Sequence, residues 1–234
     1  MSEQEGKMQK PKHVALILDG NRRWAQQQGL SKMEGHQKGK ENVHTVPEDF
    51  FKKGVPVVTI YAFSTENWKR KQEEVEYLME LLEKAVDEEF HKAMEKGARI
   101  LVSGRYQELP GELPRKCEDV MERSRDNTQG TLNICLNYGG RVEIVDAVRA
   151  LVHQGYSAEE ITEESISENL YQPELGDPDV IVRTSGEKRL SGFQLWGSAY
   201  SELMFVDKYW PDFGPEDVDH VIEEFSRRKR RYGE

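Results

Sequence analysis

The sequence has few cysteines, no long hydrophobic run and no excess of basic residues, and each absence excludes a class of protein. Its 234 residues include two cysteines, Cys117 and Cys135, which lie in different segments without the spacing of metal ligands. They predict neither a disulfide framework nor a zinc site, and they favour a reducing, cytoplasmic compartment. No apolar run approaches the ~20 residues that span a bilayer. Residues 1–12 are polar and lack the apolar centre of a signal peptide, so we interpret them as a flexible leader.

The charge balance is acidic, with a net charge of −10. A general nucleic-acid binder carries a basic footprint, so the composition argues against that class. The basic run "RRKRR" at 227–231 is interpreted as the solvated end of a helix, where cations are favoured by the helix dipole. Hydrophobic residues make up 36% of the chain, which is enough for a packed core and argues against global disorder.

Segments typical of strands alternate with segments that have helical periodicity. The predicted strands are 13–18, 56–62, 98–104, 131–138 and 179–184, and the predicted helices are 36–53, 73–96, 112–126, 141–153, 158–170 and 215–231. Such alternation predicts an α/β fold with a mostly parallel central sheet flanked by helices. No repeat, linker or shift in composition divides the chain, so residues 13–234 are predicted to form a single domain.

Pro47 lies inside the first predicted helix and makes its boundaries uncertain. The segment 73–96 is more regular and places apolar side chains on one face: Val75, Leu78, Met79, Leu82, Val86 and Phe90. Gly97 follows as a predicted C-terminal cap.

The loop after the first strand carries the sequence "DGNRRW", residues 19–24. Ligands of open α/β sheets bind beyond the carboxyl ends of the strands. Asp19 could hold a hard cation such as Mg²⁺, and Gly20 would allow the backbone to approach a ligand. The alternative interpretation is that Asp19 caps a helix and pairs with Arg23. This stretch alone leaves both open.

The loops after two other strands are also polar. "AFSTENWKRK" follows the second strand and is typical of a capped helix start, which leaves Trp68 and Arg70 unexplained. The loop after the fifth strand carries Arg183, Lys188 and Arg189, and arginine is the preferred partner of phosphate oxygens. Locally basic loops in an acidic protein, together with one metal-binding carboxylate, predict a site for two phosphorylated substrates, with magnesium shared with one of them.

Six segments, in order, resemble the cis-prenyltransferase family, and within it the undecaprenyl diphosphate synthase (isoprenyl transferase) type. They are "HVALILDGNRRWA", "GHQKG", "TIYAFSTENWKR", "TLNICLNYGGRVEIVDAV", "DPDVIVRTSGEKRLSGFQLW" and "AYSELMFVDKYWPDF". The resemblance runs from about His13 to Gly233.

The resemblance implies a hydrophobic tunnel beside the sheet and a Mg²⁺-dependent reaction. Isopentenyl diphosphate would be condensed successively onto an allylic diphosphate primer, with farnesyl diphosphate as the expected primer. The expected product is undecaprenyl diphosphate, the lipid carrier precursor for cell-wall glycan synthesis. The resemblance also implies a homodimer. A peripheral membrane contact for product release is a further hypothesis, and no nucleic-acid partner is expected.

The resemblance also assigns site residues. Asp19 would be the essential aspartate that holds Mg²⁺, Asn67 the residue assigned to proton removal, and Glu202 a second metal-associated acid. A neutral amide accepts a proton poorly, so we expect Asn67 to orient a phosphate oxygen or a water molecule. The remaining residues would bind substrate: Gly20, Asn21, Arg22, Arg23, Trp24, Lys32, His36, Ser64, Thr65, Glu66, Trp68, Arg70, Arg183, Arg189, Leu190, Ser191, Arg231 and Gly233.

Some positions depart from the family pattern, and they bear on efficiency and primer choice. They are Arg22, Lys32, Lys71, Gly192 and Gly197. A non-catalytic partner subunit of such an enzyme is a competing interpretation, but it would tend to lose the metal aspartate and the arginines. A haloacid-dehalogenase-type phosphohydrolase would need a second aspartate where Asn21 stands. A trans-type prenyl synthase would need a DDxxD motif, which the sequence lacks.

Overall fold

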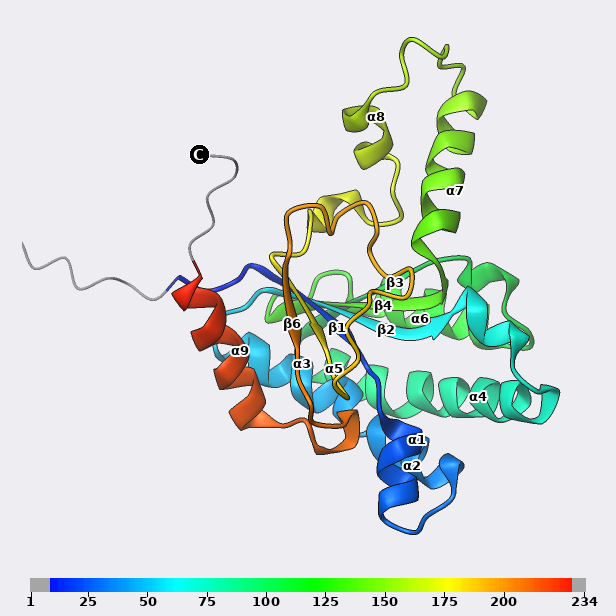
Figure 1. Cartoon of the computed structure of the whole chain (residues 1–234). Helices are drawn as coiled ribbons and strands as arrows, with labels where there is room; N and C mark the ends of the chain where they lie inside the picture. The colour runs from blue at the N-terminus through cyan, green and yellow to red at the C-terminus, as the bar shows by residue number, and fades with distance from the viewer. Residues whose placement is uncertain (1–8, 229–234) are drawn as a thin grey trace, which may run out of the picture.

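A single six-stranded sheet forms the centre of the molecule in the computed structural model, which describes residues 9–228 (Figure 1). The strand order is β3-β4-β2-β1-β5-β6, and every neighbouring pair is parallel. The strands are β1 (His13–Ile17), β2 (Val57–Ser64), β3 (Ala98–Ser103), β4 (Gly130–Tyr138), β5 (Val180–Arg183) and β6 (Glu202–Phe205). The predicted parallel α/β sheet is confirmed, with β6 as a strand that the sequence did not predict.

Helices connect the strands and cover the sheet. They are α1 (Asn21–Gln27), α2 (Lys32–Lys40), α3 (Asn42–Lys52), α4 (Gln72–Ala85), α5 (His91–Glu95), α6 (Leu113–Ser124), α7 (Gly140–His153), α8 (Glu163–Glu168) and α9 (Pro215–Arg227). A π-helical segment, Val86–Phe90, joins α4 to α5. The predicted helix 36–53 is therefore two helices, and Pro47 is buried inside the second of them. The predicted helix 158–170 is shorter, with α8 as its only α-helical part.

The two faces of the sheet have different cores. Val14 and Leu16 of β1 pack into the larger hydrophobic cluster, whereas Ala15 and Ile17 pack into the smaller one. This alternation follows from the period of two along a strand. The larger cluster includes apolar residues of α3, α4, α6 and α9, and α3, α4, α5 and α9 lie together on that side of the sheet (Figure 1). On the other side, α7 and α8 rise side by side away from the sheet (Figure 1).

The apolar face predicted for 73–96 is buried. Val75, Leu78, Met79, Leu82, Val86 and Phe90 are each at most 9% exposed. Gly97 has φ +86°, a left-handed conformation that suits the predicted C-terminal cap.

The topology places three loops at one edge of the sheet. Strands β2, β1 and β5 are neighbours, and Ile17 pairs with both Tyr61 and Arg183. Because the strands are parallel, the loops that follow them leave from the same edge. These are the polar loops that the sequence singled out.

Candidate active site

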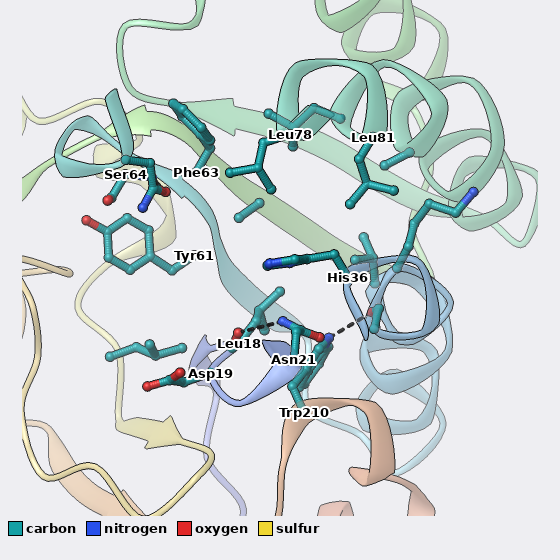
Figure 2. A pocket seen from close by; sticks show the side chains of 18 of the residues that line it. Leu18, Asp19, Asn21, His36, Tyr61, Phe63, Ser64, Leu78, Leu81 and Trp210 are labelled. Carbon is teal, nitrogen blue, oxygen red and sulfur yellow. Dashed lines mark hydrogen bonds between the residues drawn. The ribbon is translucent and has the colours of Figure 1, made fainter. Parts of the chain in front are cut away.

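A cavity of about 700 Å³ opens at the carboxyl edge of the sheet, against α2 and α4. Figure 2 shows Asp19 and Ser64 on one side of it, and Leu78 and Leu81 of α4 on the other. Its polar lining is Asp19, Asn21, His36, Lys40, Ser64, Glu66, Asn67, Arg70, Arg183, Arg189 and Ser191. Its apolar lining includes Leu18, Ala62, Phe63, Val43, Leu78, Leu81, Leu82, Ala85 and Phe90. The cavity is therefore suited to an amphiphilic ligand with a charged head and an apolar chain.

A second cavity of about 740 Å³ adjoins the first and is rich in cations. The two cavities share Leu18, Asp19, Asn21, His36, Arg70 and Arg189. The second cavity adds Gly20, Arg22, Arg23, Lys32 and Glu187 to the lining. Most residues that the sequence assigned to substrate binding are thereby brought together around two connected spaces.

Asp19 is held by two arginines. The Nη2 atom of Arg183 donates to Asp19 Oδ2 at 2.8 Å, and Arg23 Nη2 lies 3.4 Å from Asp19 Oδ1. Burial raises the pKa of this carboxyl, but the hydrogen bond and charge of Arg183, with the charge of Arg23, outweigh burial and leave the pKa below its ordinary value. Asp19 is therefore an anion at neutral pH.

The backbone of Asp19 is fixed from both sides. Its N–H donates to Thr184 Oγ1 at 2.9 Å, the same hydroxyl donates to its carbonyl oxygen at 2.6 Å, and the N–H of Trp210 donates to that oxygen at 3.0 Å. The helix that follows has Gly20 at its N-cap and no side-chain cap. Asp19 therefore does not cap α1, although its expected pairing with Arg23 is present.

Gly20 is required by the packing of the chain itself. Its φ is +107°, and a Cβ atom there would lie 2.7 Å from Tyr209 Cδ1. The sequence predicts that Gly20 allows the backbone to approach a ligand. In the structure, the close neighbour of this backbone is the Tyr209 side chain.

Arg183 and Arg189 line the first cavity together with Asp19. Arg183 is 5% exposed and donates from Nη1 to Arg189 O at 2.5 Å and to Ser191 Oγ at 2.9 Å. Arg189 and Arg23 both pair with Glu187, at 2.5 Å and 3.1 Å. These arginines are therefore paired with the protein's own acceptors, except for Arg183 Nε, which is buried without a hydrogen-bond partner among residues 9–228.

His36 lines both cavities, and Figure 2 shows its ring among the side chains that line the first. Burial lowers the pKa of His36 to about 4, and the nearby Arg70 and Arg22 charges also lower it, against Glu74. Its ring is therefore neutral at pH 7. Its Nε2 is buried and has no hydrogen-bond partner among residues 9–228, so it is available to a ligand.

The loop after β2 uses Asn67 to hold its own backbone. Asn67 Oδ1 accepts from the N–H of Ser64 at 2.9 Å. Because its oxygen is already an acceptor, the geometry favours an orienting role over proton removal. Arg70, at the end of the same loop, pairs with Glu74 at 2.8 Å, and Glu74 also pairs with Arg22 at 3.3 Å. Glu74 thus ties this loop to α1.

Among residues 9–228, four predicted substrate-binding residues line neither cavity. Trp24 Nε1 donates to Asp212 at 2.8 Å, and Trp68 Nε1 donates to Asn137 at 2.8 Å. Leu190 packs against the smaller hydrophobic cluster, and Thr65 adjoins Glu66. These residues shape the loops that carry the site.

Glu202 is not brought to Asp19 within one chain. It begins β6 and pairs with Val180 at the amino end of β5, whereas Asp19 lies beyond the carboxyl end of the neighbouring β1. Its carboxylate is 2.8 Å from Arg228. Asp19 and Glu202 of the same chain therefore lie at opposite edges of the sheet and cannot bind one magnesium ion together. Arg231 and Gly233, which the sequence also assigned, lie outside the described residues.

Sequence reasoning missed several lining or positioning residues, among them Lys40, Thr184 and Trp210. Lys40 follows His36 by four residues on α2, and that spacing places both on one helix face. This spacing was the sequence signal that could have indicated that Lys40 lines the cavity. The contacts of Thr184 and Trp210 with Asp19 depend on tertiary packing and had no local signal.

Comparisons with known proteins agree with this geometry. A family model described as "Putative undecaprenyl diphosphate synthase" matches residues 17–233. The isoprenyl transferase of Thermotoga maritima is 45% identical over 228 residues, which cover 97% of this chain and 98% of that protein. The crystal structure of lavandulyl diphosphate synthase from Lavandula x intermedia, in complex with dimethylallyl diphosphate, matches with a TM-score of 0.89 at 31% identity, over 96% of this chain and 99% of that one. A probable undecaprenyl diphosphate synthase from Campylobacter jejuni matches with a TM-score of 0.83 at 28% identity, over 97% and 100%.

Proposed function

The chain belongs to the undecaprenyl diphosphate synthase family of prenyltransferases, and on this premise we propose that it elongates an allylic diphosphate with isopentenyl diphosphate units, each new double bond being cis. The observation that carries the proposal is the position of Asp19. It stands between a cation-rich cavity and one whose far part is apolar, in contact with Arg183 and Arg23. A diphosphate head and a prenyl chain need these two environments side by side.

The residues around the polar end have distinct proposed roles. Arg22, Arg23 and Lys32, with the His36 ring, bind the diphosphate of the allylic primer. Arg183, Arg189 and Ser191 bind the diphosphate of isopentenyl diphosphate. Arginine forks and fixed dipoles aimed at a leaving diphosphate lower the barrier, because they stabilise the charge that develops on it. Asn67 and Ser64 hold the loop that orients the acceptor of the proton lost from the condensed product.

A magnesium ion fits the donor set. Among residues 9–228, no group of three His, Cys, Asp or Glu side chains forms a cage for a metal ion. Mg²⁺ commonly binds through one or two carboxylates while substrate phosphates and water supply the other oxygens. Asp19 is such a carboxylate, anionic and facing both cavities. Bound there, Mg²⁺ would neutralise negative charge on the diphosphate.

The proposed primer is farnesyl diphosphate and the proposed product is undecaprenyl diphosphate. The proposal of a long product is supported by the match to the undecaprenyl diphosphate synthase family. The apolar wall of α4, formed by Leu78, Leu81, Leu82 and Ala85, would receive the growing chain. The same residues also pack the core, since one helix face can serve both purposes.

The assay incubates the purified protein with farnesyl diphosphate and labelled isopentenyl diphosphate, with Mg²⁺ or with EDTA. Extracted lipids are then resolved by chain length. We expect a ladder of products that EDTA abolishes and that Asp19→Ala reduces by roughly 10²- to 10³-fold, the usual effect of removing one electrostatic contact to a transition state. Asp126→Ala is the matched control, because the Asp126 side chain is 93% exposed. A ladder unaffected by EDTA and by Asp19→Ala would contradict the proposed roles. No product with any primer would favour a partner-dependent subunit.

We further propose a homodimer in the cytoplasm. Exposed apolar side chains on and near α7, Val145, Val152 and Tyr156, support an association surface. The free, buried thiols of Cys117 and Cys135 support a reducing compartment. No helix in residues 9–228 has the length and hydropathy that crossing a bilayer requires. The oligomer is tested by light scattering, and a peripheral membrane contact by co-sedimentation with liposomes, where absence of binding would count against it.

A further inference from the structure

A buried lysine lines the apolar part of the cavity. Lys40, the last residue of α2, is 5% exposed. It is part of the cavity wall, together with Val43, Ala85 and Phe90. Its ammonium lies 2.5 Å from Glu88 Oε2, in the π-helical segment Val86–Phe90. Lysine commonly places its stem on an apolar surface and its charge at a polar partner.

Position along α4 shows how deep Lys40 lies. Glu74, in the first turn of α4, pairs with Arg70 at the polar end of the cavity. Glu88 lies fourteen residues further on, about 20 Å away at ~1.5 Å of rise per residue. The cavity-lining leucines of α4, including Leu81 in Figure 2, lie between these two levels. The Lys40–Glu88 pair is therefore at the end of the cavity remote from Asp19.

The π-helical segment that receives Lys40 is itself firmly held. Glu89 is 1% exposed, and its carboxylate contacts His44 Nδ1 and lies 3.1 Å from Lys92 Nζ. Lys40 Nζ is 3.9 Å from the same carboxylate. Neighbouring Glu88 and Glu89 thus fix both the backbone of this wall and the position of the ammonium. π-Helical insertions of this kind are frequent at functional sites.

We propose that Lys40 is a specificity-determining residue that limits the length of the prenyl product, an inference that rests on the proposed function. A chain that grows along α4 meets the Lys40 side chain where its ammonium pairs with Glu88, at the remote end of the cavity. To pass it, the chain must move the ammonium away from Glu88 and place apolar carbons against an unpaired charge. Burying a charge without its partner is unfavourable, so elongation stops in preference to displacing Lys40.

Two substitutions separate the steric and the electrostatic parts of this barrier. Lys40→Ala removes the stem and the charge, whereas Lys40→Met keeps a flexible side chain of similar length without the charge. Both are expected to fold, because the Glu88 side chain is 49% exposed and Glu89 keeps His44 and Lys92. The matched control is Lys38→Ala on the same helix, since Lys38 is exposed and pairs with Glu41 at 2.6 Å outside the cavity.

The measurement is the longest product formed from farnesyl diphosphate with isopentenyl diphosphate in excess, alongside the single-turnover rate of the first condensation. We expect the longest product to gain at least one isoprene unit in Lys40→Ala and in Lys40→Met, with the larger gain in Lys40→Ala. The first condensation should stay within about twofold of the wild-type rate, because it occurs at the other end of the cavity. Lys38→Ala should leave both quantities unchanged.

The outcomes distinguish the two proposals. If the unsubstituted protein elongates the primer but folded Lys40→Ala and Lys40→Met proteins give its ladder unchanged, the role of Lys40 is wrong and the proposed function stands. If Lys38→Ala lengthens the product as much as Lys40→Ala, the effect is not specific to the cavity wall, and the inference also fails. If the unsubstituted protein makes no product from any primer, the proposed function itself fails.

Discussion

The folded state should lose stability as the pH falls from 7 to 5, and His13 should account for a defined part of the loss. His13 is 4% exposed at the start of β1. Its Nδ1 is 3.0 Å from the carbonyl oxygen of Gly176, which can only accept, so Nδ1 carries the proton. Nε2 then accepts from the hydroxyl of Thr59 at 2.8 Å. A second proton on the ring would break this arrangement.

The hydrogen bond to Thr59 continues across the sheet. Thr59 Oγ1 accepts from Asn133 Nδ2 at 3.3 Å, and Asn133 Oδ1 accepts from Ser103 Oγ at 2.8 Å. The Thr59 hydroxyl, which begins this row, has His13 Nε2 as its acceptor only while His13 is neutral. Burial is the main reason that the pKa of His13 falls to about 4, against the raising effects of the Gly176 hydrogen bond and the Asp179 charge.

The sign and the size follow from linkage. Between pH 6.5 and pH 4 the unfolded chain binds a proton at His13 and the folded chain does not, so stability is present above this window and is lost as the pH falls through it. With pKa values of about 4 folded and ~6.5 unfolded, the loss from pH 7 to pH 5 is about 2 kcal/mol.

The assay is urea unfolding at pH 7, 6 and 5 on three proteins. His13→Asn cannot titrate, so its loss between pH 7 and pH 5 should be smaller than that of the unsubstituted protein by about 2 kcal/mol. Its stability at pH 7 should also be lower, because Thr59 loses its acceptor. His220→Asn, at an exposed position of α9, is the control and should keep the original pH dependence. If His13→Asn keeps it as well, the interpretation of His13 is refuted.

Two further predictions concern the polar end of the cavity. Gly39→Ala places a Cβ 2.0 Å from Asn21 Oδ1 and 2.9 Å from Trp210 Cδ1. This substitution should therefore lower the free energy of unfolding by about 1–3 kcal/mol. The control is Gly214→Ala, where a Cβ would have no atom within 4 Å, and it should change the free energy of unfolding by less than about 0.5 kcal/mol. Equal losses in urea unfolding would contradict this packing argument. Glu187→Gln removes the partly exposed ion pairs of Glu187 with Arg23 and Arg189. Calorimetry should therefore show that inorganic pyrophosphate binds about two- to fivefold more tightly. Weaker binding would show that Glu187 instead orients the two arginines.

The sheet could be predicted from the sequence except at its edge. Strands β1 and β5 are buried along their whole length, so each reads as a continuous apolar run. Strand β6 has four residues, of which only Met204 is buried, and Leu203 is 38% exposed. A short edge strand of this kind gives no periodic signal, and its pairing depends on β5 being in place. Its existence is therefore a tertiary result.

The helices were predicted less completely, because the spacing of apolar residues does not show where one helix ends and the next begins in a new direction. The sequence predicts one helix over residues 36–53, yet α2 ends at Lys40 and α3 begins at Asn42. Glu41 between them keeps a right-handed helical conformation, with φ −58°. The π-helical segment after Ala85 is equally hidden, since it leaves Val86 and Phe90 buried as a regular helix would.

For the site, the sequence predicted which loops meet but not how their charges pair. A parallel sheet forces the loops after β1, β2 and β5 to one edge, so Asp19, Asn67 and Arg183 could be placed together in advance. Family resemblance suggested Glu202 as a second metal-associated acid, but the register of β6 puts it at the opposite end of the sheet. Register and the path of long side chains, such as that of Lys40, emerge only from packing.

The pairing of charges in the site explains how an acidic protein can hold anionic substrates. Acidic side chains pair with the cations of the site: Asp19 pairs with Arg183, Glu187 with Arg189, and Glu74 with Arg70. When a diphosphate binds, the arginines therefore exchange one set of anionic partners for another, and the cost of desolvating them is compensated by the new ion pairs. The carboxylates displaced in this way, Glu187 and Glu74, are partly exposed, so water can solvate them. Asp19 differs, because its backbone is clamped by Thr184 and Trp210, so its carboxylate stays beside the bound anion. Two anions held that close repel unless a cation lies between them, and this is the physical reason to expect Mg²⁺ to be needed for productive binding rather than for folding.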